Sequence, residues 1–186
     1  MNRTAFASAS ALLLCLVGTQ ASAQTSFQVF GGDTTNSPTF DRPFEDFSDL
    51  SPSGAGVHYD TYTFTASISG NYIFNTTAAF DSYVFLYQGS FDPSSPLNNG
   101  VIGNDDTIFG ESFFASGFEA ALTAGTTYIY VTTGFDESSV GAYSTTIAGP
   151  APISAVPEVG TYALMALGLV ALGLNARRRQ RETEAA

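Results

Sequence analysis

Apolar and polar residues alternate over short stretches through most of the chain, a period of two that is typical of β-strands and not of helices. Turn-forming residues such as Ser69-Gly70-Asn71 separate these stretches. The pattern predicts strands over residues 58–66, 72–76, 82–87, 114–122, 126–133 and 141–147, with an edge strand near 27–30. The stretch 82–87 is apolar on both faces, which predicts a central position in a sheet.

Short strands separated by turns predict an all-β fold, an antiparallel, jelly-roll-like β-sandwich over residues 24–149. The strand 72–76 is expected to return beside 58–66 after the turn at 69–71. One face of the 114–122 strand is expected to carry Phe114, Phe118, Ala120 and Leu122. Residues 24–56 have a weaker pattern and three prolines, which predicts mostly loop structure.

The N-terminus has the three parts of a secretory signal peptide. Arg3 is followed by an apolar stretch over 5–18, and Ala21-Ser22-Ala23 matches the small-x-small rule for cleavage. We therefore predict a signal peptide over residues 1–23, cut between Ala23 and Gln24. The expected partners are the Sec-type export machinery and signal peptidase.

Near the C-terminus, residues 159–176 contain no charged side chain. As a helix they would be ~27 Å long, close to the ~30 Å hydrocarbon core of a bilayer. A basic cluster follows, formed by Arg177, Arg178, Arg179 and Arg181, and the positive-inside rule places it in the cytoplasm. This predicts one transmembrane helix and a membrane stop, preceded by a Pro/Ala spacer over 150–155.

The order Val156-Pro157-Glu158, apolar span and arginine run resembles the PEP-CTERM sorting signal of Gram-negative bacteria. The resemblance covers about the last 30 residues, 156–186, and departs from the usual motif in having Val159 where the family has proline. It implies an exosortase as a partner, transient anchoring in the inner membrane, and release to the cell envelope or an exopolysaccharide matrix. Because Val159 replaces the usual proline, removal of the helix and permanent anchoring both stay open.

Charge and composition exclude several classes of function. Between Gln24 and Ala155, Arg42 is the only basic residue against 14 carboxylates, a net charge of −13. Such a body repels nucleic acid and anionic lipid. Cys15 is the only cysteine, so a disulfide framework and a cysteine zinc site are excluded, and His58, the only histidine, leaves almost no raw material for a Ser-His-Asp triad.

Residues 57–148 also resemble bacterial pre-peptidase C-terminal-type β-sandwich domains. The segments that carry the resemblance occur in the same order, and they are Tyr62-Thr63-Phe64, Gly70-Asn71-Tyr72, 81–87, Asn104-Asp105-Asp106 and 122–128. The family implies a non-catalytic accessory or binding module, sometimes associated with calcium.

Acidic residues in loops are the one candidate chemistry. Asp81 precedes a predicted strand, and Asn104, Asp105 and Asp106 lie in a glycine-flanked loop. Ca²⁺ takes about six to eight oxygen ligands from such loops, so these residues are a candidate metal site. Asp and Asn are also ordinary turn formers, as Asp92 is expected to be, and both interpretations stay open.

The sequence thus favours a non-enzymatic, exported protein of the cell envelope or exopolysaccharide matrix that needs no cofactor, apart from a possible Ca²⁺. The rival hypothesis is a carbohydrate- or calcium-binding extracellular module. An enzyme is the least favoured hypothesis, because no residue spacing indicates a nucleophile or a carboxylate pair.

Overall fold

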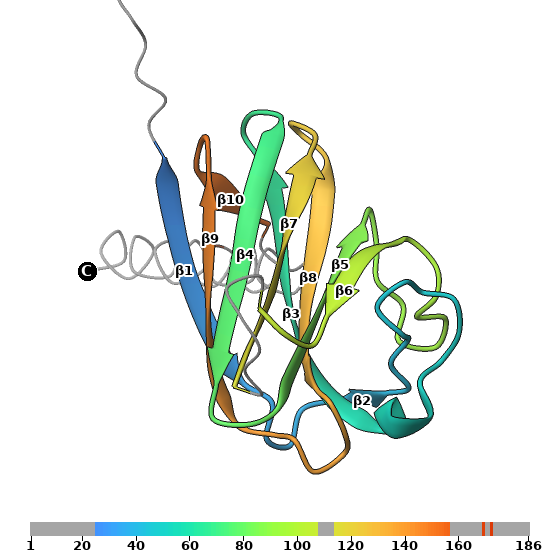
Figure 1. Cartoon of the computed structure of the whole chain (residues 1–186). Helices are drawn as coiled ribbons and strands as arrows, with labels where there is room; N and C mark the ends of the chain where they lie inside the picture. Colours follow the sequence, from blue (N-terminus) through green and yellow to red (C-terminus); the bar gives the residue numbers. More distant parts are fainter. Residues whose placement is uncertain (1–24, 108–113, 157–168, 170–171, 173–186) are drawn as a thin grey trace, which may run out of the picture.

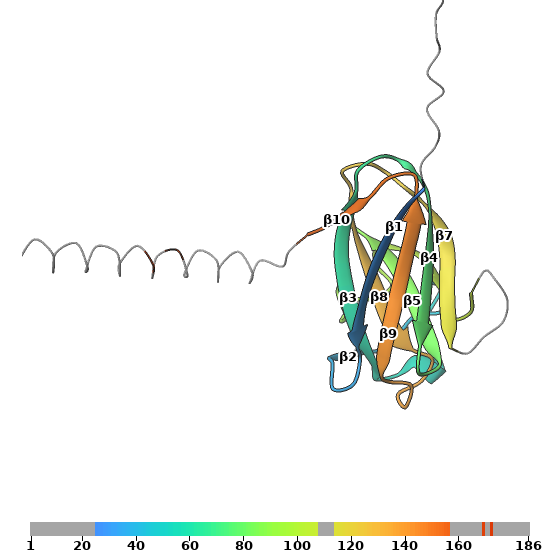
Figure 2. The same ribbon diagram turned by 90° about the vertical axis from the view of Figure 1, so that its left-hand side faces the viewer.

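Two antiparallel β-sheets pack face to face in the computed structural model, which describes residues 25–107, 114–156, 169 and 172 (Figures 1 and 2). The first sheet has the strand order β1-β9-β4-β7 and the second β10-β3-β8-β5-β6, with β2 paired to β3. The strands are β1 (Ser26–Asp33), β2 (Thr39–Phe40), β3 (Val57–Ala66), β4 (Gly70–Ala78), β5 (Ser82–Gln88), β6 (Gly100–Asn104), β7 (Ala115–Leu122), β8 (Thr127–Gly134), β9 (Ala142–Gly149) and β10 (Ile153–Ala155). The chain crosses repeatedly between the two sheets, as in a jelly roll, so the predicted all-β sandwich is confirmed.

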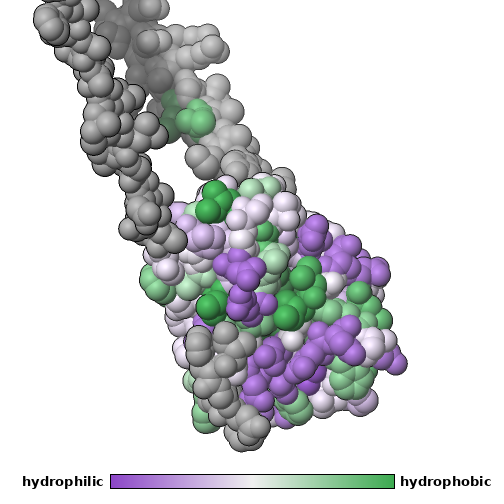
Figure 3. All heavy atoms as spheres, turned by 45° about the horizontal axis from the view of Figure 1, so that its top comes forward, coloured by the Kyte–Doolittle hydropathy of each residue, from purple (hydrophilic) through white to green (hydrophobic). Residues whose placement is uncertain are grey.

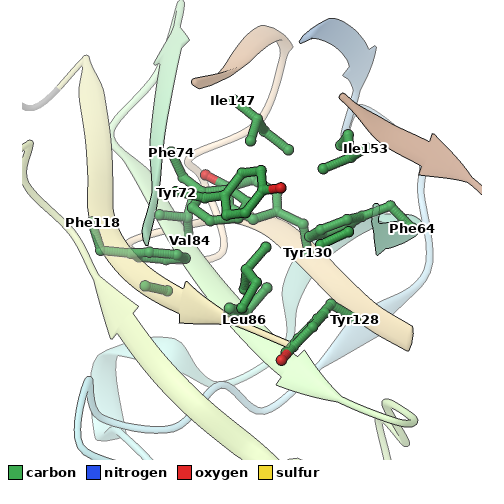
Figure 4. Close-up of a cluster of buried hydrophobic side chains, with 13 residues drawn as sticks. Phe64, Tyr72, Phe74, Val84, Leu86, Phe118, Tyr128, Tyr130, Ile147 and Ile153 are labelled. Carbon is green, nitrogen blue, oxygen red and sulfur yellow. The ribbon is translucent and has the colours of Figure 1, made fainter. Parts of the chain in front are cut away.

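The main core fills the space between the sheets, because alternate side chains of each strand point inward. Aromatic rings from both layers dominate it (Figure 4). Phe74 of β4 stacks on Tyr130 of β8 with ring centroids 5.4 Å apart. The fully buried hydroxyl of Tyr130 is satisfied by Thr76, which in turn bonds Thr145. The aromatic layer is therefore fixed in position by a buried hydrogen-bond chain as well as by packing.

A second core covers the outer face of the β10-β3-β8-β5-β6 sheet. Its members from the sheet include Phe85 and Tyr87, and these are covered by Phe40, Phe47 and Phe91 from the segments before β3 and after β5. Residues 41–56, between β2 and β3, form irregular structure with a short 3₁₀ helix, η1 (Pro52–Gly54), whereas the expected edge strand near 27–30 is part of the longer β1. With a core on each face, β5 is buried on both sides and lies between β8 and β6, which confirms its predicted central position.

Strand β4 differs in its partner from the sequence prediction. It does follow β3 after a short turn, but it pairs with β7 and β9 in the opposite sheet and not with β3. Both strands carry aromatic side chains on their inward faces, Phe64 on β3 and Phe74 on β4. With the two strands in opposite sheets, these rings pack against each other across the core with centroids 6.0 Å apart, so that both are buried.

Three further details depart from the expected strands. Phe114 lies outside β7 and is exposed, so it does not share the buried face of Phe118, Ala120 and Leu122. Strand β6 ends at Asn104, within the segment expected to be a loop. Residues 153–155 of the expected spacer form β10, which pairs with β3 and buries Ile153 in the main core.

The sandwich is a self-contained unit. All ten strands and both cores among the described residues lie between Ser26 and Ala155. We therefore expect a fragment of residues 24–156 (the sandwich fragment) to fold on its own.

Candidate functional site

Arg42, the lone basic residue of the body, is buried at one end of the second sheet, with a relative exposure of 1%. Its Nε and Nη2 donate to the carbonyl oxygen of Phe135, at 3.1 and 2.7 Å. Nη1 donates to the Pro43 carbonyl and Nη2 also to Ser53 Oγ. The guanidinium lies 4.1 Å from the centre of the Tyr83 ring, a cation–π distance. Backbone oxygens and ring faces thus stabilise the buried charge.

Local backbone structure places Arg42 there. Its N–H donates to the Gly54 carbonyl, and its own carbonyl accepts from Ser51 N–H, so the η1 turn holds it on both sides. Gly54 has to be glycine, because a Cβ there would overlap the Cγ of Arg42. The side chain then extends over Tyr83 of β5 and reaches the end of β8 at Phe135.

A cavity of about 430 Å³, the Arg42 cavity, opens beside this side chain. Its wall combines three kinds of group: aromatic rings, carboxylates and serine hydroxyls. The rings are those of Phe44, Tyr83 and Phe135, the carboxylates those of Glu45, Asp46 and Asp105, and the hydroxyls those of Ser48, Ser51 and Ser53.

The pairing of β5 with β6 brings the predicted acidic residues to this same end. Val84 is opposite Asn104, so Asp81, just before β5, and Asp105 and Asp106, just after β6, converge. Asn104 has a structural role, because its Nδ2 donates to the Gly117 carbonyl of β7. Within the described part of the chain, no three carboxylate, histidine or cysteine side chains are grouped closely enough to hold a metal ion. The Ca²⁺ site therefore stays a prediction.

Burial, together with the excess of negative charge, shifts the pKa values of several side chains. Desolvation, with the neighbouring Asp105 carboxyl, raises the pKa of Glu45. Desolvation likewise raises the pKa of Asp81, and the nearby charges of Asp105, Asp136 and Asp106 add to this effect. Burial lowers the pKa of Arg42, which the surrounding anionic groups partly oppose. The end of the sheet is therefore a region where an additional positive or neutral polar group would be favoured over an anion.

Other acidic residues serve as turn formers. Asp33, Asp46, Asp92 and Asp136 each accept a hydrogen bond from the backbone N–H two residues later. Hydrogen bonds from the hydroxyls of Thr35, Ser48, Ser94 and Ser138, together with these backbone bonds, hold the pKa of each carboxyl below its usual value. The expectation that Asp92 forms a turn is confirmed. Asp46 combines a turn with a place on the cavity wall.

Sequence reasoning did not find Glu45, Arg42 or Phe135 as parts of this site. The signal for Arg42 was present in the composition, since a single arginine among 14 carboxylates needs a specific environment. No signal pointed to Glu45, which reaches β6 through a tertiary contact, its carbonyl accepting from Gly103 N–H.

The predicted sorting and export residues lie mostly outside the described residues. The residues outside the described part of the chain are Ala21, Ala23, Gln24, Pro157, Glu158 and the arginines of the membrane stop. Val156 is described, and its N–H donates to the Thr63 carbonyl of β3 at 2.9 Å. Of the expected span 159–176, only Leu169 and Leu172 are described, and no helix among the described residues has the length and hydropathy needed to cross a membrane.

Comparison with known proteins assigns no family. No protein-family profile and no curated protein matches the chain. Six chains of solved structures match. One of them, described as CBM35 from Cellvibrio japonicus Abf62, is 11% identical with a TM-score of 0.38, over 71% of this chain and 99% of that chain. Similarity at this level defines neither a family nor a function.

Proposed function

We propose that the chain is a non-enzymatic, exported protein of the cell envelope or exopolysaccharide matrix whose sandwich binds polysaccharide at the Arg42 cavity. The sorting part of the proposal rests on the resemblance carried by Val156-Pro157-Glu158, the apolar span and the arginine run. The binding part rests on one observation, the joint presence of rings, carboxylates and hydroxyls around one cavity.

This combination suits a polyhydroxylated ligand. Carboxylate oxygens accept hydrogen bonds from sugar hydroxyls, and serine hydroxyls both donate and accept. The ring of Phe44, 43% exposed, offers an apolar surface to the C–H face of a sugar. The volume of about 430 Å³ lies within the range of roughly 300–1,000 Å³ that is usual for small-ligand sites.

Charge narrows the class of polysaccharide. Glu45, Asp46 and Asp105 line the cavity, and the whole body has a net charge of −13. Uronate-rich or sulfated chains would be repelled, whereas neutral and amino-sugar polymers would not. We therefore expect neutral or cationic glycans to be the ligands.

The absence of catalysis is part of the proposal. The Nδ1 of His58, the single histidine, lies 2.6 Å from the Ser37 carbonyl oxygen. A carbonyl oxygen can only accept, so the Nδ1–H group donates this hydrogen bond. Glycosidases need two carboxyl groups about 5 Å or more apart to flank the scissile bond, and no residue spacing in the sequence indicates such a pair.

Affinity gel electrophoresis of the sandwich fragment tests the binding. Neutral and amino-sugar polysaccharides should retard it, and polyuronates should not. Asp105→Ala should weaken retardation by about tenfold or more, since it removes an acceptor of charge-assisted hydrogen bonds. The control is Asp92→Ala, which removes the same charge from an exposed turn. Equal losses in the two variants, or no retardation by any polymer, would contradict the proposal.

Calcium binding is the second candidate, favoured by the β5–β6 pairing that brings Asp81, Asp105 and Asp106 to one end of the sheet and by the effect of Asp105 on the pKa of Glu45. A cation there would relieve their repulsion. Ca²⁺ should then raise the melting temperature of the sandwich fragment, and Asp105→Ala should abolish the increase. A melting curve unchanged at millimolar Ca²⁺ would leave Asp81, Asn104, Asp105 and Asp106 as structural residues.

A further inference from the structure

Only one cation of the chain lies among the carboxylates of the Arg42 cavity. Glu45, Asp46 and Asp105 line the cavity together with Arg42, which gives the wall a net charge of −2. Arg42 is the only Lys or Arg between residues 24 and 155. It donates its hydrogen bonds to two carbonyl oxygens and a hydroxyl, and not to a carboxylate. The wall therefore favours a cationic group that comes from outside the chain.

The hydroxyl of Tyr83 is a second, independent feature of this cavity. Tyr83 lines the cavity and is only 3% exposed, yet its Oη forms no hydrogen bond within the part of the chain that the structure describes. Burial raises the pKa of this hydroxyl, and the charges of the three wall carboxylates add to the effect, whereas Arg42 partly opposes it. The hydroxyl therefore lies near those carboxylates. Buried hydroxyls normally have a partner, so this one is available to a ligand.

The aromatic side chains of the wall indicate an organic cation and not a metal ion. Ca²⁺ takes about six to eight oxygen ligands. Among the residues that the structure describes, no three carboxylate, histidine or cysteine side chains are close enough to hold a metal ion. Phe44 precedes Glu45 in the same wall and is 43% exposed. A ring face attracts an ammonium group, and a carboxylate forms a charge-assisted hydrogen bond with it.

A second cavity shows that size alone does not produce these features. It has a volume of about 410 Å³ and lies beside the turn from β3 to β4, at the end of the sandwich that Figure 3 brings forward. Hydrophobic residues at this end form separate spots among hydrophilic ones. Among the described residues of the cavity wall, Glu119 is the only charged one and none is aromatic. The two cavities thus differ in charge and in rings at nearly the same volume.

We propose that the group bound in the Arg42 cavity is the ammonium group of an amino sugar that carries no acetyl group. This inference rests on the proposed glycan function and narrows its ligands to glycans with free amines. An ammonium group has three donors, which match Glu45, Asp105 and the Tyr83 hydroxyl, while the sugar ring packs on Phe44. Glu45 and Asp105 then determine specificity, because an acetylated amine has no charge to interact with them.

Isothermal titration calorimetry of the full chain with chitosan and chitin tetramers tests this inference. The two tetramers share one backbone and differ in having free or acetylated amines. A polyoxyethylene detergent keeps the apolar end segments in solution and contains no competing sugar. At a pH between the pKa of Glu45 and that of the sugar amine, the chitosan tetramer should bind about tenfold or more tightly than the chitin tetramer. This preference should decrease as salt rises from about 0.05 to 0.5 M.

Three variants separate recognition of the charge from glycan binding in general. Glu45→Gln should weaken binding of the chitosan tetramer by about tenfold or more and remove the preference. The variant should stay folded, because the pKa of Glu45 is raised and its charge does not stabilise the protein. Tyr83→Phe keeps the ring over Arg42 and should act in the same direction. The matched control Glu119→Gln removes the same charge from the second cavity and should leave the preference unchanged.

The outcomes distinguish this inference from the proposed function on which it rests. Equal binding of the two tetramers would overturn the inference and leave the glycan function standing. A loss in Glu119→Gln as large as that in Glu45→Gln would also overturn it, because the attraction would then come from the total charge of the body. Tetralysine bound as tightly as the chitosan tetramer would assign the cavity to basic peptides and contradict the glycan function as well.

Discussion

Arg42 determines much of the geometry of the candidate site. A buried cation is costly unless its donors are satisfied, and here two carbonyl oxygens and a hydroxyl accept from it while Tyr83 and Phe135 offer their ring faces. The carboxylates of Asp105, Asp81 and Glu45 act on it electrostatically from the surroundings. The side chain therefore holds the ends of β5 and β8 and the η1 turn together, which shapes the cavity wall.

The contributions of Glu45 and Asp92 to the free energy of unfolding should change with pH in opposite directions. The pKa of Glu45 is raised in the folded protein, so its ionised carboxylate destabilises the folded state. This loss of stability is absent below the pKa of Glu45 in the unfolded chain, near 4.5, and it appears as the pH rises through the pKa in the folded protein. Glu45→Gln should raise the free energy of unfolding at pH 7 and have little effect below about pH 4. Urea midpoints of the sandwich fragment from pH 3 to 7 measure the difference.

Asp92→Asn is the control with the opposite sign. Hydrogen bonds from Ser94 lower the pKa of Asp92, so its stabilisation is present above the unfolded value of 3.8 and is lost as pH falls. This variant should be less stable than the parent at pH 7 and equal to it at the lowest pH. Effects of both variants that do not change with pH would contradict the electrostatic account.

Sequence alone reached only part of the candidate site. It selected Asp81, Asp105 and Asp106 from their places beside predicted strands, and strand pairing does bring these residues to one end of the sheet. It also selected Asn104, whose amide proves to bond the neighbouring strand. Glu45 lies about sixty residues before Asp105 in a segment with no strand pattern, and only the tertiary fold brings the two together.

At the scale of elements, long alternating segments were predictable and their partners were not. Strands β3, β8 and β9 follow from the strand patterns of the sequence, and β5 follows from a run that is apolar on both faces. The pairing of β4 was not predictable, because an inward aromatic face fits either sheet equally well. Strand β6 contains two glycines among five residues, and β10 follows two prolines, so neither has a clear local signal.

Strand β10 should contribute measurably to stability although it was expected to be part of a spacer. A fragment ending at Gly149 loses the buried Ile153 side chain, the β10–β3 pairing and the bond from Val156 N–H to Thr63. We expect its free energy of unfolding to be about 2–4 kcal/mol lower than that of the 24–156 fragment, as for loss of a large buried aliphatic group. Urea denaturation measures the difference.

Ile153→Ala in the 24–156 fragment separates the side chain from the strand. It should reproduce most of the loss, because the cavity left by Ile153 opens into the main core. Equal midpoints for the fragments ending at residues 149 and 156 would place the domain boundary before β10, as the sequence suggested.

At the scale of the whole molecule, the sandwich continues up to the expected sorting motif. Strand β10 ends at Ala155, and Val156 is already bonded to β3, so little free chain separates the folded body from Pro157. An enzyme that acts on the motif would meet it beside a sheet edge.

Intact mass of the protein isolated from its own cells tests the sorting proposal. The resemblance of Val156-Pro157-Glu158 and the following segments to a sorting signal predicts loss of residues 1–23 and of the C-terminal apolar segment with its arginines. Glu158→Ala should block the second loss, because it removes the only charge between Asp136-Glu137 and the arginine run. Glu137→Ala, which removes the same charge from an exposed loop of the sandwich, should leave processing unchanged. A mature protein that still carries Arg177 to Arg181 would instead indicate a permanent anchor, with Val159 in place of proline as the feature to revert first.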